Sequence, residues 1–206
     1  MRLGVLVSGR GSNLEAVLRA VVDGRLPEVE PALVVANRHG IRALEVAARA
    51  GVRWRVMVTA DHADADARDA AIGQAMEETG CALVLLAGYD QLLRPPYFAA
   101  YAGRTINIHP SLLPRHGGRG MLGLAVHASV LEAGDVETGV TVHDVTEELD
   151  AGPTITQVRM AVEPGLTPRE LAERVLSLEH RTVVEVLSRL SASMTAAPPA
   201  PIRARR

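Results

Sequence analysis

Short apolar runs alternate with stretches of helical periodicity throughout the first half of the chain. Apolar runs bounded by glycine or polar residues indicate buried strands, whereas apolar residues spaced three and four apart indicate amphipathic helices. A glycine after a helical stretch marks its C-terminal end, as at Gly51 and Gly80. The strands expected from this pattern are Leu3–Val7, Ala32–Ala36, Arg53–Val58 and Leu83–Ala87, and the helices are Leu14–Val22, Ile41–Ala50 and Ala65–Thr79.

The second half of the chain is less regular but contains the same two kinds of pattern. Pro168 suits the first turn of a long terminal helix that runs to Leu190, because Leu171, Val175, Leu178 and Val183 fall on one helical face. The remaining expected elements are helices over Pro96–Tyr101 and Leu124–Ala133, strands over Thr105–His109, Val136–Val145 and Ile155–Val162, and a glycine- and proline-rich loop over Pro110–Gly123.

This order of elements predicts an α/β fold with a doubly wound, mostly parallel central sheet flanked by helices. The strand Leu83–Ala87 is apolar on both faces, as a parallel sheet covered by helices requires. No repeat or linker divides the chain, so we expect one domain over residues 1–190. Residues 191–206, rich in alanine, proline and arginine, are expected to form an exposed coil.

Composition narrows the possible functions. The chain has 206 residues, 48% of them hydrophobic, which is enough for one substantial core. A formal net charge of −2 and 2% aromatic residues argue against a nucleic-acid partner, which would need a basic face or stacking platforms. All 22 basic residues are arginines, which excludes a Schiff-base lysine, a pyridoxal-phosphate lysine and a Walker-type phosphate-binding lysine.

Cysteine and histidine usage gives no indication of a metal or a disulfide. The single cysteine, Cys81, precedes a buried strand and is expected to be structural. The first apolar run is too short for a signal peptide, and no stretch is long enough to span a membrane, so we expect a cytoplasmic protein. No metal-ligand spacing is shown by His39, His62, His127, His143 and His180.

A glycine-rich turn, Gly9–Asn13, lies between the first strand and the first helix. Such a turn allows close backbone approach, and the free N–H groups of the helix start favour an anion, so it is a candidate phosphate site. Alternatively, Ser12 and Asn13 only cap the helix. A dinucleotide is disfavoured, because Leu14 replaces the third glycine of that fingerprint and Asn37 stands where its acidic residue is expected.

The segment from Asn107 to Pro114 is the candidate catalytic element. Asn107 and His109 are two residues apart in an expected strand, so they share a face at its C-terminal end, where open α/β sheets bind ligands. An amide can hold a developing oxyanion and an imidazole can exchange a proton near neutral pH, a pair suited to acyl transfer. A hydrogen-bonded core histidine is the alternative.

Three carboxylates occupy the loop Thr146–Pro153 between two later strands. A solvated acidic turn would explain them. Spacing alone does not show whether Asp150 reaches His109.

Three motifs occur in one order: Gly-Ser-Asn after the first strand, Asn-Ile-His-Pro-Ser-Leu-Leu-Pro in mid-chain and Glu-Leu-Asp-Ala-Gly-Pro downstream. Together they resemble the phosphoribosylglycinamide formyltransferase family of purine biosynthesis, over about residues 1–190. The pair Glu179–His180 in the terminal helix favours this branch of the folate-dependent formyltransferases. The resemblance implies a Rossmann-like formyltransferase fold and transfer of a formyl group from 10-formyltetrahydrofolate to the amine of glycinamide ribonucleotide, without a metal, in a monomer or homodimer.

The resemblance also implies residue roles. Asn107 would stabilise the oxyanion and His109 would be the general acid, while Asp150 would hold His109 and raise its pKa. The substrate phosphate would lie on Gly11, Ser12 and Asn13, its ribose would meet Glu179, and the Leu113–Pro114 bond would be cis. The implied folate-binding residues are Asp90, Gln91, Leu92, Leu93, Asn107, Thr146, Glu147, Glu148, Leu149 and Asp150.

Some positions depart from the family pattern. The family often carries a basic residue at the position of Gln91 and an arginine at that of Ala65, which leaves the affinity for folate open. The loop Arg115–Met121 is glycine-rich, a variant of the usual sequence. The alternatives to glycinamide formylation are a sister formyltransferase with another acceptor amine, a formyltetrahydrofolate hydrolase, and a non-catalytic or NAD-binding Rossmann module.

Overall fold

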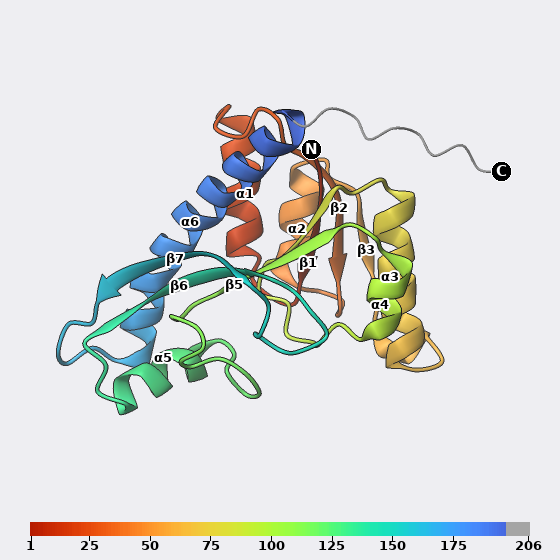
Figure 1. The fold of residues 1–206 in the computed structure, drawn as a ribbon. Helices are drawn as coiled ribbons and strands as arrows, with labels where there is room; N and C mark the ends of the chain where they lie inside the picture. The colour runs from red at the N-terminus through yellow and green to blue at the C-terminus, as the bar shows by residue number, and fades with distance from the viewer. Residues whose placement is uncertain (197–206) are drawn as a thin grey trace.

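The computed structural model describes residues 1–196, with side chains through residue 194. Its core is one sheet with helices on both faces (Figure 1). The elements are β1 (Arg2–Val7), α1 (Ser12–Val22), β2 (Glu30–Ala36), α2 (Arg42–Arg49), β3 (Trp54–Val56), a 3-10 turn η1 (Thr59–Asp61), α3 (Ala65–Glu78), β4 (Leu83–Leu86), α4 (Pro95–Ala100), β5 (Arg104–His109), α5 (Leu124–Glu132), β6 (Glu137–Asp144), β7 (Thr154–Ala161) and α6 (Pro168–Ala196).

The seven strands follow the order β3-β2-β1-β4-β5-β6-β7. The first five strands of this order are parallel, and β6 and β7 are added antiparallel to β5. The sequence order reverses between β1 and β4, which is where open α/β sheets leave a crevice at their carboxyl edge. The predicted doubly wound, mostly parallel sheet is confirmed.

Two apolar cores hold the helices to the sheet. One lies beneath α1, α2 and α6, where Leu171, Val175 and Val183 are fully buried on the face of α6 that the periodicity predicts. The other lies beneath α3 and α4 on the opposite face, around Tyr97 and Met76 (Figure 1). The phenol of Tyr97 also hydrogen-bonds Thr105 Oγ1 at 2.8 Å, which joins α4 to β5. The helices therefore cover both faces of the parallel part of the sheet.

Most boundaries agree with the sequence prediction to within two residues, but one strand is half as long as predicted and one helix is longer. Strand β3 is shorter than Arg53–Val58, because it is an edge strand that pairs only with β2 and its Trp54 is 47% exposed. Helix α6 continues past Leu190 to Ala196, so the coil expected from residue 191 is wrong as far as 196. No proline interrupts this stretch before Pro198, and Ser193 Oγ donates to the carbonyl of Arg189 at 2.9 Å. Residues 197–206 lie outside the described part.

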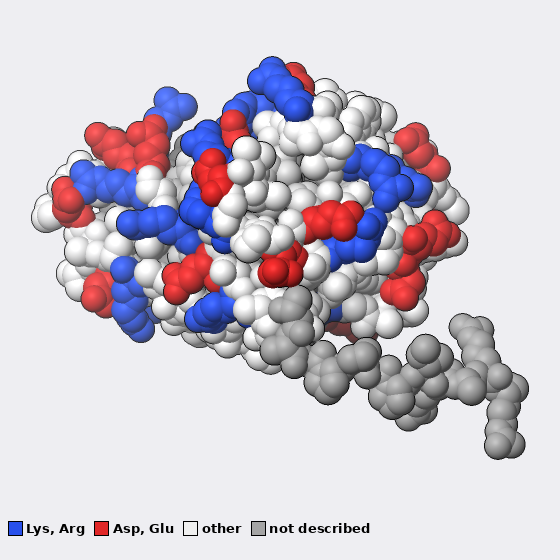
Figure 2. Space-filling view, turned by 90° about the horizontal axis from the view of Figure 1, so that it is seen from above, with Lys and Arg blue, Asp and Glu red and all other residues white. Residues whose placement is uncertain are grey.

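Arginine and acidic side chains are interspersed on the face seen in Figure 2, without a continuous patch of one sign. Ion pairs such as Arg104–Asp144 and Arg42–Glu15 join charges from different elements. This distribution agrees with the low net charge. Within residues 1–196, no helix has the length and apolar character needed to cross a membrane.

Candidate active site

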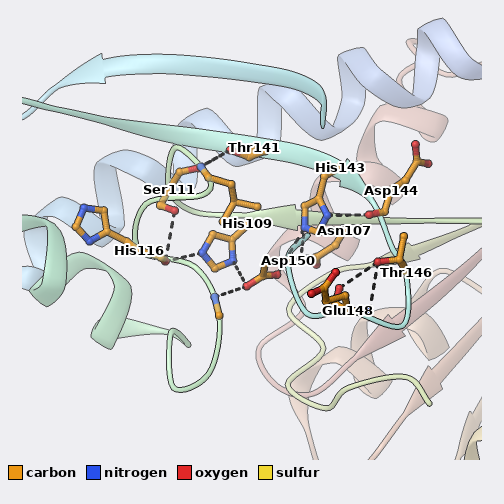
Figure 3. Close-up of polar contacts among 12 residues, drawn as sticks. Asn107, His109, Ser111, His116, Thr141, His143, Asp144, Thr146, Glu148 and Asp150 are labelled. Carbon is orange, nitrogen blue, oxygen red and sulfur yellow. Dashed lines mark hydrogen bonds and ion pairs between the residues drawn. The ribbon is translucent and has the colours of Figure 1, made fainter. Parts of the chain in front are cut away.

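Strand β5 ends at the open edge of the sheet and carries Asn107 and His109. As predicted, the two side chains extend to the same side of the strand (Figure 3), while Ile106 and Ile108 are buried in the core beneath α6. Strand β4 on one side and β6 on the other hold β5 in place. The alternating pattern thus presents an amide and an imidazole from a rigid element.

Asp150 reaches this pair from the loop between β6 and β7. Its Oδ2 lies 3.9 Å from Nδ1 of His109, and its Oδ1 lies 3.7 Å from Nε2 of His143. The carboxylate accepts a hydrogen bond from the backbone N–H of Gly118 at 2.8 Å. Asp150 has φ 54, the left-handed conformation in which aspartate is one of the tolerated residues. The loop therefore brings one of its three carboxylates to His109 and His143.

His143 is a member of this site that the sequence did not reveal. In the antiparallel pairing of β5 and β6, His143 lies directly opposite Asn107, and its Nε2 is 3.1 Å from the amide nitrogen of Asn107. The other ring nitrogen is 2.9 Å from the carbonyl of Asp144 and must donate to it, since a carbonyl only accepts. Nε2 then accepts one hydrogen from Asn107 Nδ2, and the second remains for an oxyanion.

The ring of His109 is held between two acceptors. Nε2 lies 2.9 Å from the carbonyl of His116 and therefore carries a hydrogen, while Nδ1 faces the carboxylate of Asp150 (Figure 3). A distance of 3.9 Å is too long for a direct hydrogen bond, so Nδ1 is the nitrogen left to exchange a proton with a ligand. The geometry thus separates a structural N–H from a reactive nitrogen.

The net pKa of His109 is lowered, although Asp150 acts to raise it, as expected. Burial of the ring, which is 5% exposed, is the largest cause and disfavours the charged form. The hydrogen bond to the His116 carbonyl and the charge of Asp150 oppose this effect but do not overcome it. The ring is consequently a stronger acid when protonated.

A cavity of about 1140 Å³ opens beside these residues and extends to the glycine turn after β1. Gly11 is the N-cap of α1, with φ 72, and no side chain caps this helix. Ser12 and Asn13 therefore do not cap this helix with their side chains, contrary to that part of the alternative. A Cβ at Gly11 would also lie 2.7 Å from the Cβ of Ala43, so only glycine fits this turn. The first turn of α1 lies at this end of the cavity, and its N–H groups lack intrahelical partners, an arrangement suited to an anion.

Glu179 of α6 closes this end of the cavity beside Asn13. The amide nitrogen of Asn13 donates to Oε1 of Glu179 at 3.2 Å, and Oδ1 of Asn13 is buried without a hydrogen-bond partner among the described residues. Burial raises the pKa of Glu179 to about 7, although the Asn13 hydrogen bond and Arg10 oppose it. A carboxylate whose ionised form is disfavoured by burial, and the Oδ1 atom of Asn13 with no hydrogen-bond donor in the described part of the chain, thus lie next to the candidate phosphate turn.

The segment Asp90–Leu93 lines the opposite part of the cavity. Asp90 is engaged by Asn37 Nδ2 at 2.7 Å and by Arg38, and its own N–H donates to Ser8 Oγ at 2.9 Å. Leu93 is buried, whereas Leu92 is 45% exposed. The predicted folate segment is therefore a cavity wall fastened to the ends of β1 and β2.

A buried arginine, Arg68, lies next to the uncharged Gln91. Arg68 of α3 donates to the side-chain oxygen of Gln91 and to Thr59 Oγ1, the latter at 2.9 Å. Its guanidinium also forms an ion pair with Asp69 at 2.6 Å, and both side chains are almost fully buried. A cationic side chain thus lies beside position 91, and Asp69 balances its charge.

The loop Thr146–Asp150 contributes four of its five predicted residues to the cavity wall, namely Thr146, Glu148, Leu149 and Asp150. Glu147 is exposed and is not part of that wall, so the structure does not bring this predicted folate residue to the site. Thr146 Oγ1 bonds both the carbonyl and the N–H of Glu148, at 3.1 and 3.3 Å. This local turn directs the loop back toward β5.

The structure also places the cysteine, a further histidine and the proline bond that the sequence analysis named. Cys81 is buried, and burial raises its pKa to about 11, which fits a structural thiol. His127 of α5 also lines the cavity, and burial lowers its pKa to about 4. The Leu113–Pro114 bond is cis, as the resemblance implied. Among residues 1–196 no group of three or more histidine, cysteine or acidic side chains is arranged to hold a metal.

Comparisons with known proteins agree with this geometry. A family model described as formyl transferase matches residues 1–187. The chain is 36% identical over 188 residues to phosphoribosylglycinamide formyltransferase of Escherichia coli (strain K12), covering 91% of this chain and 86% of that protein. It is 39% identical over 183 residues to the trifunctional purine biosynthetic protein adenosine-3 of Gallus gallus, covering 88% of this chain but only 17% of that protein.

Solved structures show the same fold. The crystal structure of glycinamide ribonucleotide transformylase 1 from Symbiobacterium toebii superposes with a TM-score of 0.87 at 39% identity, covering 94% of this chain and 88% of that one. Phosphoribosylglycinamide formyltransferase from Bacillus halodurans gives a TM-score of 0.86 at 30% identity, covering 94% of this chain and 97% of that one. The Rossmann-like fold that the motifs implied is confirmed.

Proposed function

The chain belongs to the formyl transferase family, and on that premise we propose that it transfers the formyl group of 10-formyltetrahydrofolate to the amine of N1-(5-phosphoribosyl)glycinamide. The observation that carries this proposal is the convergence of Asn107, His109 and Asp150 at one end of a cavity whose other end is a phosphate-type glycine turn. An acyl-transfer group and an anion site in one cavity fit a phosphorylated amine acceptor.

The reaction begins when the acceptor amine attacks the formyl carbon and the carbonyl π electrons move to oxygen. The free hydrogen of Asn107 Nδ2 and the protonated Nδ1 of His109 stabilise the resulting oxyanion. The protonated His109 gives its Nδ1 proton to N10 of the folate, the C–N10 bond breaks as the carbonyl re-forms, and Nδ1 then takes up the proton that the amine nitrogen loses. His109 is the general acid in this exchange, because Nε2 is committed to the His116 carbonyl and only Nδ1 faces the ligand.

Asp150 keeps the proton on the reacting side of His109. Its carboxylate lies opposite Nδ1 and stabilises the imidazolium, which burial otherwise disfavours. The lowered pKa makes the imidazolium a stronger acid toward N10, at the cost of a smaller protonated fraction at neutral pH. Asp150 thus offsets part of the desolvation that the closed site imposes.

The two substrates occupy the two ends of the cavity. The glycine turn and the start of α1 receive the phosphate, with Gly11, Ser12 and Asn13, and Glu179 accepts hydrogen bonds from the ribose hydroxyls. The folate lies along the walls formed by Asp90–Leu93 and by Thr146–Asp150, which meet at Asn107. This arrangement brings the amine and the formyl group together beside His109.

The test measures folate absorbance change and product formation with both substrates, and the parent protein should produce formylglycinamide ribonucleotide and tetrahydrofolate. Formate release without the acceptor would instead indicate a hydrolase, and formylation of another amine a sister transferase. If the protein binds no folate, the remaining interpretation is a non-catalytic or NAD-binding Rossmann module.

Variants of the central residues test the mechanism. His109→Ala and Asp150→Asn should each reduce kcat by about two or more orders of magnitude. Asparagine suits the positive φ at position 150 and can still accept from Gly118, so this variant removes mainly the charge. Asp23→Asn, at the distant end of α1, is the matched control and should retain activity. Near-normal turnover of either site variant would remove the role given to that residue.

A further inference from the structure

The loop between β5 and α5 places a second histidine, His116, against the first. The contact is made by its backbone carbonyl, which accepts from His109 Nε2 at 2.9 Å and from Ser111 Oγ at 3.4 Å. His116 has φ 55, in the left-handed region that few residues other than glycine adopt. Such a conformation persists only where the surrounding structure holds it.

Both ring nitrogens of His116 are anchored, each to a different part of the chain. Nδ1 lies 2.8 Å from Ser129 Oγ on α5, and Nε2 lies 2.9 Å from Oδ2 of Asp135, just beyond that helix. Arg115 also contacts Asp135, whose side chain is 8% exposed. Because a hydroxyl can donate or accept, both anchors persist whether the ring is neutral or charged. The ring therefore clamps the loop that carries the carbonyl.

The carbonyl has a chemical consequence for His109. Asp150 alone, facing Nδ1 at 3.9 Å, would draw the single hydrogen of a neutral ring to Nδ1. The His116 carbonyl facing Nε2 draws it to the other side. With the hydrogen on Nε2, Nδ1 keeps a lone pair and can take up the proton that the attacking amine releases. With the hydrogen on Nδ1, the neutral ring has no acceptor facing the substrate.

We propose that His116 is a positioning residue: its ring, anchored by Ser129 and Asp135, holds the loop so that its carbonyl keeps a hydrogen on Nε2 of His109 and leaves Nδ1 to carry the catalytic proton. The kinetic part of this proposal rests on the proposed formyl transfer. The tautomer of His109 is a property of the protein without substrates and does not rest on it.

His116→Gly removes the anchors but keeps a residue for which the left-handed backbone costs nothing. We expect kcat to fall about 10- to 100-fold, with KM for both substrates within about threefold, because the turn at Gly11 and the folate walls are untouched. Ser129→Ala removes one anchor without disturbing a helix, and should lower kcat about three- to tenfold. Ser177→Ala, an exposed serine on α6, is the matched control and should leave kcat unchanged.

Nuclear magnetic resonance of ¹⁵N-labelled histidine reads the tautomer and the pKa of His109 directly, with His109→Gln used to assign the signals. The parent should show a hydrogen on Nε2, and His116→Gly should shift the population toward Nδ1–H and lower the pKa, since the carbonyl favours the charged ring. If His116→Gly does not fold, Ser129→Ala should show the same change to a smaller degree.

Unchanged tautomer and pKa in a folded variant would overturn the proposal, as would a parent ring with its hydrogen on Nδ1. A rise in KM for both substrates without a loss of kcat would also overturn the proposal, because it would show that the loop shapes the binding cavity and does not position His109. If the parent protein does not formylate glycinamide ribonucleotide, the proposed function fails, and the resonance measurement still decides the role of His116.

Discussion

Replacing Glu179 by glutamine should make the protein more stable at pH 8 and weaken its binding of the phosphoribosyl substrate. The carboxylate lies in the enclosed end of the cavity between α1 and α6, where its pKa rises to about 7. Folding therefore disfavours the ionised form of Glu179. We infer that a glutamate nevertheless occupies this position because its carboxylate accepts hydrogen bonds from the ribose hydroxyls. Glutamine keeps the shape and can still accept from Asn13 Nδ2.

The magnitude follows from the difference between the folded and unfolded pKa. The rise from 4.5 to about 7 spans about 2.5 pH units, which corresponds to at most about 3.4 kcal/mol at about 1.36 kcal/mol per unit. For an acid with a raised folded pKa, the penalty is absent below 4.5, grows as pH rises and is complete above about 7. Because the carboxylate is partly solvated, we expect Glu179→Gln to raise the free energy of unfolding by about 1–2 kcal/mol at pH 8, which corresponds to a rise of roughly 2–8 °C in Tm.

Thermal unfolding at pH 8 and pH 5 measures this difference, and steady-state kinetics measures binding. The Tm advantage of Glu179→Gln should be present at pH 8 and largely lost at pH 5, while KM for the glycinamide substrate rises about tenfold or more because a charged acceptor is lost. Glu173→Gln, an exposed glutamate on the same helix, should change neither quantity. A glutamine variant that is less stable than the parent at pH 8, or equally stabilised at both pH values, refutes this reasoning.

Two further variants test the groups around the site. His143→Phe removes the acceptor that orients the amide of Asn107, so kcat should fall about tenfold with little change in Tm, as measured by kinetics and thermal unfolding. Arg68→Met leaves the fully buried Asp69 without its cation and should cost about 3–5 kcal/mol in urea unfolding, and adding Asp69→Asn should recover much of that loss.

Much of the fold follows from local patterns in the chain. The strands β1, β2 and β4 are continuous apolar runs because both faces of a parallel sheet are covered, and periodicity located the helices to within a few residues. The end of α6 lies beyond the predicted Leu190, because the alanine- and proline-rich composition of the tail does not itself stop the helix at residue 191. Residues 191–196 contain serine and alanine but no glycine or proline, and local pattern there does not oppose a helix.

The site was only partly predictable, since its contacts depend on strand pairing. The two-residue spacing of Asn107 and His109 is a local property and needs no knowledge of the partner strand. That His143 lies opposite Asn107 depends on the antiparallel register of β5 and β6, which no spacing specifies. A shift of that register by one residue would turn His143 to the other face of the sheet. The strand pairing therefore decides which polar side chains become part of the site.

The same dependence explains why the role of His116 was not visible from sequence. A histidine in a glycine-rich loop is expected to be mobile, and the sequence contains no sign of its anchors, because Ser129 and Asp135 are 13 and 19 residues away. Those anchors act only once α5 has packed against α6 and fixed the far end of the loop. The loop then contributes a backbone carbonyl, a group that every residue carries. Its function comes from position alone, so a motif that specifies side chains cannot contain it.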